Sequence, residues 1–220
     1  MTTPNDARRQ YAPATERNRE PILEVLQKVL PTNCTVLEIA SGTGEHGVFF
    51  ASRLSNRKWL PSEVNPLLLA SIEAWQIYQP ADSLYPPLGL DVCDSVWPVE
   101  TRVSPDWLQG LDFCTFPLAA VVNINMIHIA PWSACLGLMA GASRILPSGG
   151  ILYLYGPFKR NGEYTAPSNE AFDVSLRSRN PEWGVRDIND VVEVARKREL
   201  SLLATYQMPA NNLSVVFKRH

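Results

Sequence analysis

The sequence lacks both a surplus of positive charge and an uninterrupted apolar run long enough to cross a membrane. Its 220 residues carry 20 Lys and Arg against 22 Asp and Glu, a formal net charge of −2, so no global positive field attracts nucleic acid or anionic lipid. The stretch from Phe113 to Ser143 contains no charged residue. However, Asn123, Asn125 and His128 interrupt it, and a bilayer span needs about 20 predominantly apolar residues. We therefore expect a buried strand and a helix there, and neither a nucleic-acid nor a membrane partner.

Cysteine and histidine are also scarce, with four and three copies. No CxxC pair occurs, so neither a disulfide framework nor a metal site is predicted. The polar N-terminus lacks the apolar core of a secretory signal, which favours a cytoplasmic protein. Without repeats or a dividing linker, we expect a single domain over residues 1–220. Within it we expect an N-terminal helical cap at 1–30 and a substrate-lid insertion at 157–187. The expected oligomeric state is a monomer or a homodimer.

Apolar spacing predicts strands and helices that alternate along the chain. The predicted strands are 35–39, 59–64, 88–92, 118–124, 151–156, 201–208 and 213–218. The predicted helices are 18–30, 45–54, 65–78, 131–146 and 188–198, with a short helical segment at 105–109. Such alternation indicates an α/β fold with a mostly parallel sheet covered on both faces. The last two strands are joined by a four-residue turn and must form an antiparallel hairpin.

A glycine-rich turn follows the first predicted strand. Gly42-Thr-Gly-Glu-His-Gly47 satisfies G-x-G-x-x-G, and Glu63 follows 21 residues after Gly42, near the end of the second strand. Glycines at positions 42 and 44 would let a ligand approach the backbone, and a carboxylate at Glu63 could accept hydrogen bonds from both ribose hydroxyls. Glycines can also simply form a tight turn. A nucleoside-containing ligand, either a dinucleotide or S-adenosylmethionine, is the favoured interpretation.

An acidic residue before this turn favours S-adenosylmethionine. Glu38 opens the pattern Glu38-x-Ala40-x-Gly42-x-Gly44, where a carboxylate can order the turn and suit the ammonium of an amino-acid tail, whereas it would repel a pyrophosphate. The C-terminal hairpin and the helix before the first strand also resemble the class I methyltransferase fold. That fold is a Rossmann-like three-layer sandwich with a seven-stranded sheet.

An NAD(P)-dependent reductase is a weaker alternative. The only Tyr-x-x-x-Lys pattern, Tyr155 to Lys159, encloses Gly156 and Pro157. Proline in the interior of such a segment prevents the regular helix that would bring the hydroxyl and the ammonium together.

Further cofactor-binding candidates lie where predicted strands end. Asp91 and Val92 end the third strand, and Asn123 and Asn125 close the fourth. Open α/β sheets bind ligands at this carboxyl edge. Buried amides also need hydrogen-bond partners, so they either cap the next helix or line the site.

Several segments resemble one family, the methyltransferases typified by methyltransferase-like protein 26, long catalogued as a domain of unknown function. The resemblance is carried by 14–26, 36–46, 61–63, 125–132, 154–158, 175–184 and 208–212. The pieces Asn-Pro-Glu-Trp-Gly and Met-Pro-Ala-Asn-Asn are not generic to methyltransferases. The resemblance implies a class I S-adenosylmethionine-dependent fold but no substrate. It departs at Asn65, where a second acid is expected, which leaves the ribose contact to Glu63.

For a methyltransferase, we predict direct in-line displacement onto a small-molecule acceptor, because the sulfonium is already a good leaving group. Arg17 and Asn18, at a helix start, are predicted to contact the methionine carboxylate or the substrate. His128 or Tyr155 is the predicted proton acceptor. The predicted substrate-binding residues are Tyr11, Phe158, Asn169, Asp173, Arg177 and Trp183. A catalytically silent S-adenosylmethionine-binding scaffold remains an alternative.

Overall fold

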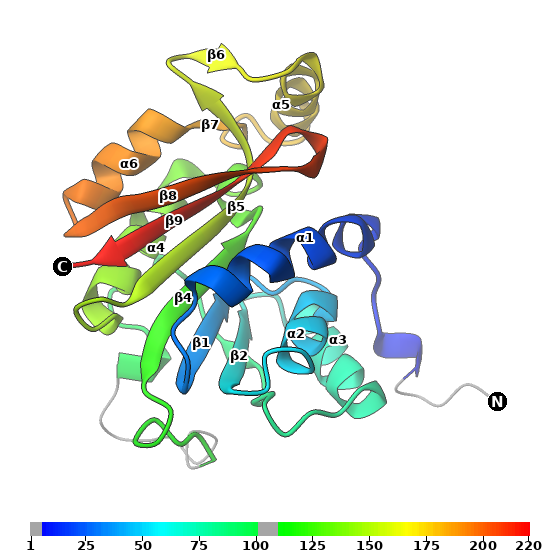
Figure 1. Cartoon of the computed structure of the whole chain (residues 1–220). Helices are drawn as coiled ribbons and strands as arrows, with labels where there is room; N and C mark the ends of the chain where they lie inside the picture. Colours follow the sequence, from blue (N-terminus) through cyan, green and yellow to red (C-terminus); the bar gives the residue numbers. More distant parts are fainter. Residues whose placement is uncertain (1–5, 101–109) are drawn as a thin grey trace.

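The described residues form a nine-stranded sheet with helices on both faces, and seven of its strands follow one another in a single row (Figure 1). The structure is a computed structural model that describes residues 6–100 and 110–220. The strands of this row are β1 (Cys34–Ile39), β2 (Arg57–Glu63), β3 (Leu88–Gly89), β4 (Leu118–Ile124), β5 (Ile151–Arg160), β8 (Leu200–Met208) and β9 (Asn212–Arg219). Their order is β3-β2-β1-β4-β5-β9-β8, and two short strands, β6 (Glu163–Tyr164) and β7 (Arg186–Asp187), also pair with β5.

The strand directions confirm the predicted sheet. Strands β3, β2, β1, β4 and β5 are mutually parallel. Strand β9 runs antiparallel to both β5 and β8, and the short helix η5 (Pro209–Asn211) joins the hairpin β8–β9. The sequence-based prediction of a mostly parallel α/β sheet ending in an antiparallel hairpin is therefore correct.

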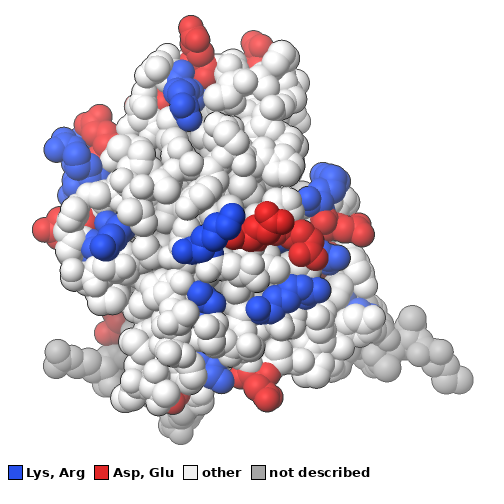
Figure 2. Space-filling view, in the orientation of Figure 1, with Lys and Arg blue, Asp and Glu red and all other residues white. Residues whose placement is uncertain are grey.

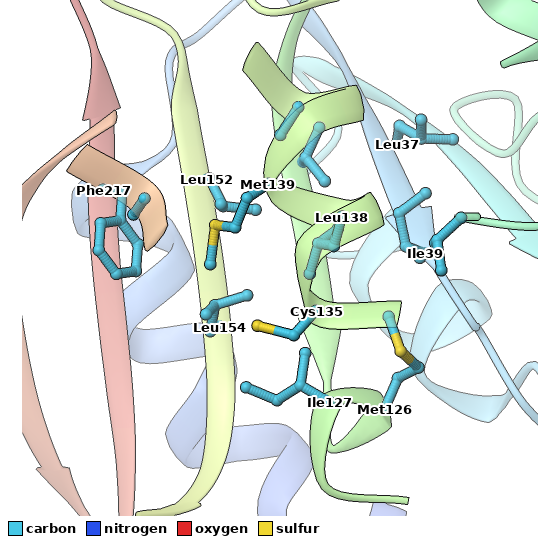
Figure 3. Close-up of a cluster of buried hydrophobic side chains, with 14 of the residues drawn as sticks. Leu37, Ile39, Met126, Ile127, Cys135, Leu138, Met139, Leu152, Leu154 and Phe217 are labelled. Carbon is cyan, nitrogen blue, oxygen red and sulfur yellow. The ribbon is translucent and has the colours of Figure 1, made fainter. Parts of the chain in front are cut away.

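Two hydrophobic cores lie on opposite faces of the sheet. The main helices are α1 (Pro13–Val29), α2 (Glu45–Ala51), α3 (Pro66–Tyr78), α4 (Trp132–Ile145), α5 (Pro167–Arg179) and α6 (Ile188–Arg196). Helices α1 and α2 pack on the face that carries Val36 and Val122. Helices α4 and α6 pack on the face that carries Leu37 and Val121, and Figure 3 shows α4 side chains over β5. Successive residues of a strand point to opposite faces, so the fully buried strand β1 and the largely buried strand β4 contribute to both cores.

Helix α1 begins earlier than predicted, at Pro13 instead of Asn18. Pro13 occupies the first turn, where a missing N–H costs nothing. Pro21, which we expected in the first turn, lies inside the helix. There it cannot donate to the carbonyl four residues earlier. The helix continues because its inner face buries Ile22 and Leu26 against the sheet.

Two strand ends differ from prediction by three or more residues. Strand β3 stops at Gly89 instead of Val92, whereas β5 continues through Pro157 to Arg160 instead of ending at Gly156. Proline is tolerated here because Pro157 lies at the end of the β9 pairing, opposite Asn212. The other predicted helices end within three residues of the observed bounds. The predicted helical segment 105–109 lies outside the described residues. Within the described part of the chain, no helix has the length and apolarity needed to cross a membrane.

Candidate functional site

The glycine turn after β1 has a backbone that favours glycine at two positions. Gly42 has φ +58° and Gly44 has φ +94°, both in the left-handed region. A Cβ atom on Gly44 would lie 2.8 Å from the Cα of Ile72 in α3. The turn and α3 can therefore pack this closely only without a side chain at Gly44.

The carboxylate of Glu63 joins the end of β2 to this turn. Its Oε2 accepts a hydrogen bond from the Gly42 N–H at 3.0 Å. Its Oε1 accepts from the N–H groups of Val64 and Asn65, at 2.9 and 3.2 Å. An ionised carboxylate offers about four lone-pair sites. Glu63 thus retains accepting capacity while it holds the turn.

A cavity of about 250 Å³ opens beside Glu63 at the carboxyl edge of the sheet. It brings together four predicted cofactor residues, Ala40, Glu63, Asp91 and Val92. The remaining walls are mainly apolar and come from the strand ends and from the start of α4. They are Ile39, Val64, Leu90, Cys93, Met126, Ala130, Pro131, Ser133 and Ala134. Of the predicted set, Asp91 is exposed, and its Oδ1 accepts from the N–H of Cys93 at 2.8 Å.

Glu38 lies beneath the turn and does not line this cavity. Its Oε2 accepts a 2.8 Å hydrogen bond from the indole N–H of Trp59, a partner that the sequence analysis did not single out. Burial raises the pKa of Glu38 to about 7. The backbone oxygen of Glu38 accepts from the hydroxyl of Ser62 at 2.7 Å. These contacts give Glu38 a supporting position below the glycine turn.

The two asparagines after β4 occupy different positions. Asn123 is buried, and its Nδ2 donates to the carbonyl of Ile39 at 3.0 Å, so it holds β4 to the end of β1. Asn125 adopts φ +65° and donates its backbone N–H to the carbonyl of Tyr155 at 2.8 Å. Only Asn125 lines a cavity, and it is a different cavity from the one beside Glu63.

This second cavity, of about 500 Å³, lies between α1, α5, η5 and the ends of β4 and β5. It collects five residues predicted for the site, namely Arg17, Asn18, Asn125, Tyr155 and Asn169. The remaining lining residues were not predicted from the sequence. They are Ala14, Ile129, Pro157, Ser168, Phe172, Pro209, Ala210 and Asn212.

A chain of hydrogen bonds crosses the floor of the second cavity. The Nδ2 of Asn212 donates to the Tyr155 hydroxyl at 3.0 Å, and the Asn18 side chain also hydrogen-bonds this hydroxyl. Asn18 Oδ1 lies 2.8 Å from Nε2 of His46 in α2. Burial raises the pKa of Tyr155, whereas burial and nearby Arg19 lower the pKa of His46 to about 3. The floor is therefore neutral at physiological pH.

The structure places His128, a predicted proton acceptor, outside both cavities. The imidazole is fully buried and lines neither cavity. It packs edge-on against Phe158, with ring centroids 5.0 Å apart, and leaves no room for a Cβ on Gly156. Burial, reinforced by Arg186, lowers the pKa of His128 to about 3. His128 and Phe158 are both fully buried, and neither contributes to the walls of the two cavities.

Three further predicted substrate residues lie away from the second cavity. Asp173 is buried and accepts hydrogen bonds from the Tyr164 hydroxyl at 2.8 Å and the Val185 N–H at 2.6 Å, so it braces the segment that follows β5. Arg177 pairs with Asp173 at 2.8 Å and faces a separate cavity. Trp183 lines neither of the two cavities described above. Of the predicted substrate-binding residues, only Asn169 lines the second cavity.

Tyr11, the remaining predicted substrate-binding residue, is 63% exposed and lines neither cavity. Its ring packs edge-on against Trp75 of α3, with centroids 5.1 Å apart. Its position therefore favours docking of the N-terminal segment on α3 over contact with a ligand.

The segment 125–130 separates the two cavities. Met126 and Ala130 line the cavity beside Glu63, whereas Asn125 and Ile129 line the other. A ligand in either cavity would contact this one segment. On the face shown in Figure 2, Lys and Arg side chains lie among Asp and Glu and form no continuous basic surface.

The fold resembles that of solved methyltransferases at low sequence identity. An O-methyltransferase family 2 protein from Planctomyces limnophilus, solved in complex with apigenin, is 16% identical with a TM-score of 0.74, over 100% of this chain and 62% of that one. The S-adenosylmethionine-dependent methyltransferase SibL, in its apo form, is 14% identical with a TM-score of 0.71, over 94% and 55%. The methyltransferase CalO1 of calicheamicin biosynthesis, in its SAH-bound form, is 12% identical with a TM-score of 0.66, over 92% and 54%.

These likenesses bear on the fold alone, and the chain spans only 54% to 62% of the length of these three proteins. A family model covers nearly the whole sequence, from residue 9 to residue 219. By this match, the chain belongs to the family described as "Protein of unknown function (DUF938)".

Proposed function

We propose that the protein is an S-adenosylmethionine-dependent methyltransferase that acts on a small-molecule acceptor. The observation that carries this proposal is the segment 125–130, which lines a cavity beside the glycine turn and Glu63 on one side and a second cavity on the other. Methyl transfer needs a donor and an acceptor held next to each other with water excluded. Two adjoining cavities at the carboxyl edge of the sheet suit that requirement.

The first cavity fits the adenosine part of the cofactor. Glu63 would accept hydrogen bonds from the ribose hydroxyls, and Asp91 would lie beside the adenine. Val92, Leu90 and Met126 provide the apolar walls that a purine ring needs. The left-handed turn at Gly42 and Gly44 keeps side chains away from the path of the methionine tail. In this proposal Ala40 borders the cofactor, while Glu38 and Asn123 hold the surrounding backbone.

When bound, S-adenosylmethionine supplies a methyl group on a sulfonium, which is a good leaving group without further activation. The residues of this chain then have to orient the acceptor and exclude water. Asn125 and Tyr155 lie on the second cavity, where they can orient an acceptor oxygen or nitrogen by hydrogen bonding. We propose direct in-line displacement, because no covalent nucleophile is required.

The finer assignment to methyltransferases like methyltransferase-like protein 26 belongs to this proposal as well. It rests on the segments quoted from the sequence, and the DUF938 match is compatible with it. The mixed charges in Figure 2 favour a small molecule over nucleic acid as the acceptor. We also propose that the protein is cytoplasmic and that it is a monomer or a homodimer.

Cofactor binding is the first test. We expect S-adenosylmethionine and S-adenosylhomocysteine to raise the melting temperature, because a ligand that binds only the folded state stabilises it. Isothermal titration calorimetry should give one site per chain. NAD(H) and NADP(H) serve as matched controls and should have no effect. Stabilisation by a nicotinamide cofactor alone would overturn the proposal.

Methyl transfer is the second test. We expect S-adenosylhomocysteine to be released when the protein is incubated with S-adenosylmethionine and a panel of small oxygen and nitrogen acceptors. Cofactor binding without turnover on any acceptor would favour the silent scaffold.

A further inference from the structure

The second cavity has an unusual charge content. Among the described residues that line it, Arg17 is the only charged side chain, and no aspartate, glutamate, lysine or histidine accompanies it. The structure gives Arg17 no ion pair or hydrogen bond to any described side chain. An exposed guanidinium at the rim of a neutral cavity is available to a ligand.

Two elements contribute exposed apolar side chains to the walls of this cavity. Phe172 of α5 is 40% exposed and Ile129, after β4, is 43% exposed, and both line the cavity. Pro157 and Pro209 add further apolar surface. Apolar side chains left uncovered in a concave site indicate a ligand with an apolar body.

The cavity also lacks a group that could take a proton from an acceptor. Burial raises the pKa of the Tyr155 phenol, so this hydroxyl stays protonated at neutral pH. His128 is fully buried behind Gly156. His46 is separated from the cavity by Asn18, which holds its ring nitrogen. An acceptor that has to lose a proton before the transfer would find no base among these residues.

We propose that the second cavity binds a small organic anion, with an apolar or aromatic body and a carboxylate or phenolate oxygen held near Arg17, and that this anion is the methyl acceptor. This inference deepens the proposed function and rests on it for the transfer step. The guanidinium pairs well with a planar oxyanion. The Tyr155 hydroxyl and the amides of Asn125 and Asn212 can hydrogen-bond the remaining polar atoms. A cationic amine would be repelled by Arg17 and would find no carboxylate among the described lining residues.

The transfer then needs no base. A lone pair of the oxyanion forms the new oxygen–carbon bond, while the carbon–sulfur bond breaks and its electron pair stays on sulfur. The acceptor's negative charge and the sulfonium's positive charge cancel, so a neutral ether or ester and a neutral thioether result, and no proton is transferred.

The binding test uses three probes with the same ring and different charge: benzoate, benzamide and benzylamine. With S-adenosylhomocysteine present, we expect benzoate to bind about fivefold or more tightly than benzamide, and benzylamine to bind least, by ligand-observed NMR. In Arg17→Gln the preference for benzoate should disappear. Lys28→Gln removes an exposed cation further along the same helix and should leave the preference intact.

Three outcomes would overturn the inference: equal binding of benzamide or benzylamine, a benzoate preference that survives in Arg17→Gln, or no measurable benzoate binding at millimolar concentration. Failure of the proposed function would give a different result: S-adenosylhomocysteine would not bind, while the preference for benzoate would persist.

A final arm distinguishes the acceptor from the cofactor's own carboxylate as the partner of Arg17. 5′-Methylthioadenosine lacks the amino-acid tail of S-adenosylhomocysteine. If Arg17 holds the acceptor, Arg17→Gln leaves the ratio of the two affinities unchanged. A selective loss of S-adenosylhomocysteine binding would assign Arg17 to the cofactor and overturn the inference.

Discussion

Glu63 accepts a hydrogen bond from the backbone N–H of Gly42 at 3.0 Å, which ties the end of β2 to the glycine turn after β1. The acid that would bind a ribose therefore also fixes the turn that would border the rest of the cofactor. This contact already shapes the site, so little reorganisation is required on binding. One side chain links the two features that the sequence analysis singled out as a pair.

Replacing Glu63 tests this double role. Glu63→Ala removes the acceptor for Gly42 and for a ribose, and we expect at least a tenfold loss of S-adenosylhomocysteine affinity, about 1.4 kcal/mol or more. Glu63→Gln keeps one oxygen acceptor and should lose less. Calorimetric titration measures both. Glu73→Ala, in the middle of α3 and outside both cavities, is the matched control. Unchanged affinity in a folded Glu63→Ala protein would contradict the assignment.

Gly44 allows a second comparison. A Cβ at Gly44 would collide with the Ile72 backbone, whereas a Cβ at Gly162 meets no atom within 4 Å although its φ of +81° is also left-handed. Backbone strain should destabilise both alanine variants by about 1 kcal/mol or more. Only Gly44→Ala should also weaken cofactor binding, and Gly44→Val should abolish the thermal shift. Chemical denaturation and thermal shift separate the two effects. Normal cofactor binding by a folded Gly44→Val variant would show that the turn has been misassigned.

Local patterns were enough to predict the sheet and the first cavity. The apolar run of β4 gave its bounds correctly, because a strand covered on both faces is nearly all apolar, here with Asn123 as the one polar residue. Ala40, Glu63, Asp91 and Val92 could be grouped because the carboxyl ends of parallel strands share one edge.

Contacts between distant segments could not be predicted in this way. The Asn212 side chain reaches the Tyr155 hydroxyl across 57 residues. Gly156 and Pro157 looked like the end of a strand, yet both pair with β9, and pairing with β7 continues β5 through the buried Phe158. His128 was predicted to face a ligand because it follows β4 at the carboxyl edge of the sheet. The sequence alone does not reveal that its ring packs against Gly156. Tertiary packing decided each of these cases.

The buried carboxyl of Glu38 leads us to predict how the stability of the fold depends on pH. Burial raises its folded-state pKa to about 7, above the usual value near 4.3. The folded state therefore holds a proton that the unfolded state has lost. This stabilisation is complete below about pH 4 and is lost as the pH rises through 7, by up to about 1.4 kcal/mol per pH unit.

Glu38→Gln should remove this dependence while it keeps an acceptor for the Trp59 indole. We expect the free energy of unfolding of the variant, relative to wild type, to increase from pH 5 to pH 8 in urea titrations. Glu24→Gln changes an exposed side chain of α1 and is the control. Parallel stability curves for wild type and Glu38→Gln would contradict the raised pKa.

The close contact between Gly156 and His128 leads to a prediction about packing beside the segment that separates the cavities. A Cβ on Gly156 would lie 2.5 Å from His128 Nε2 and 3.3 Å from Asn125 Oδ1. Gly156→Ala should therefore overpack this region and destabilise the fold by about 1–3 kcal/mol. Gly110→Ala, where a Cβ meets nothing within 4 Å, should cost much less.

A double-mutant cycle identifies the origin of that cost. If the clash is with the imidazole, His128→Ala makes room for the new methyl group. The double variant should then be more stable than the sum of the two single losses predicts, by about 1 kcal/mol or more. Because Asn125 would also shift, Gly156→Ala should weaken benzoate binding in the second cavity more than S-adenosylhomocysteine binding in the first. Strict additivity in the cycle, measured by urea denaturation, would show that His128 does not limit the space at Gly156.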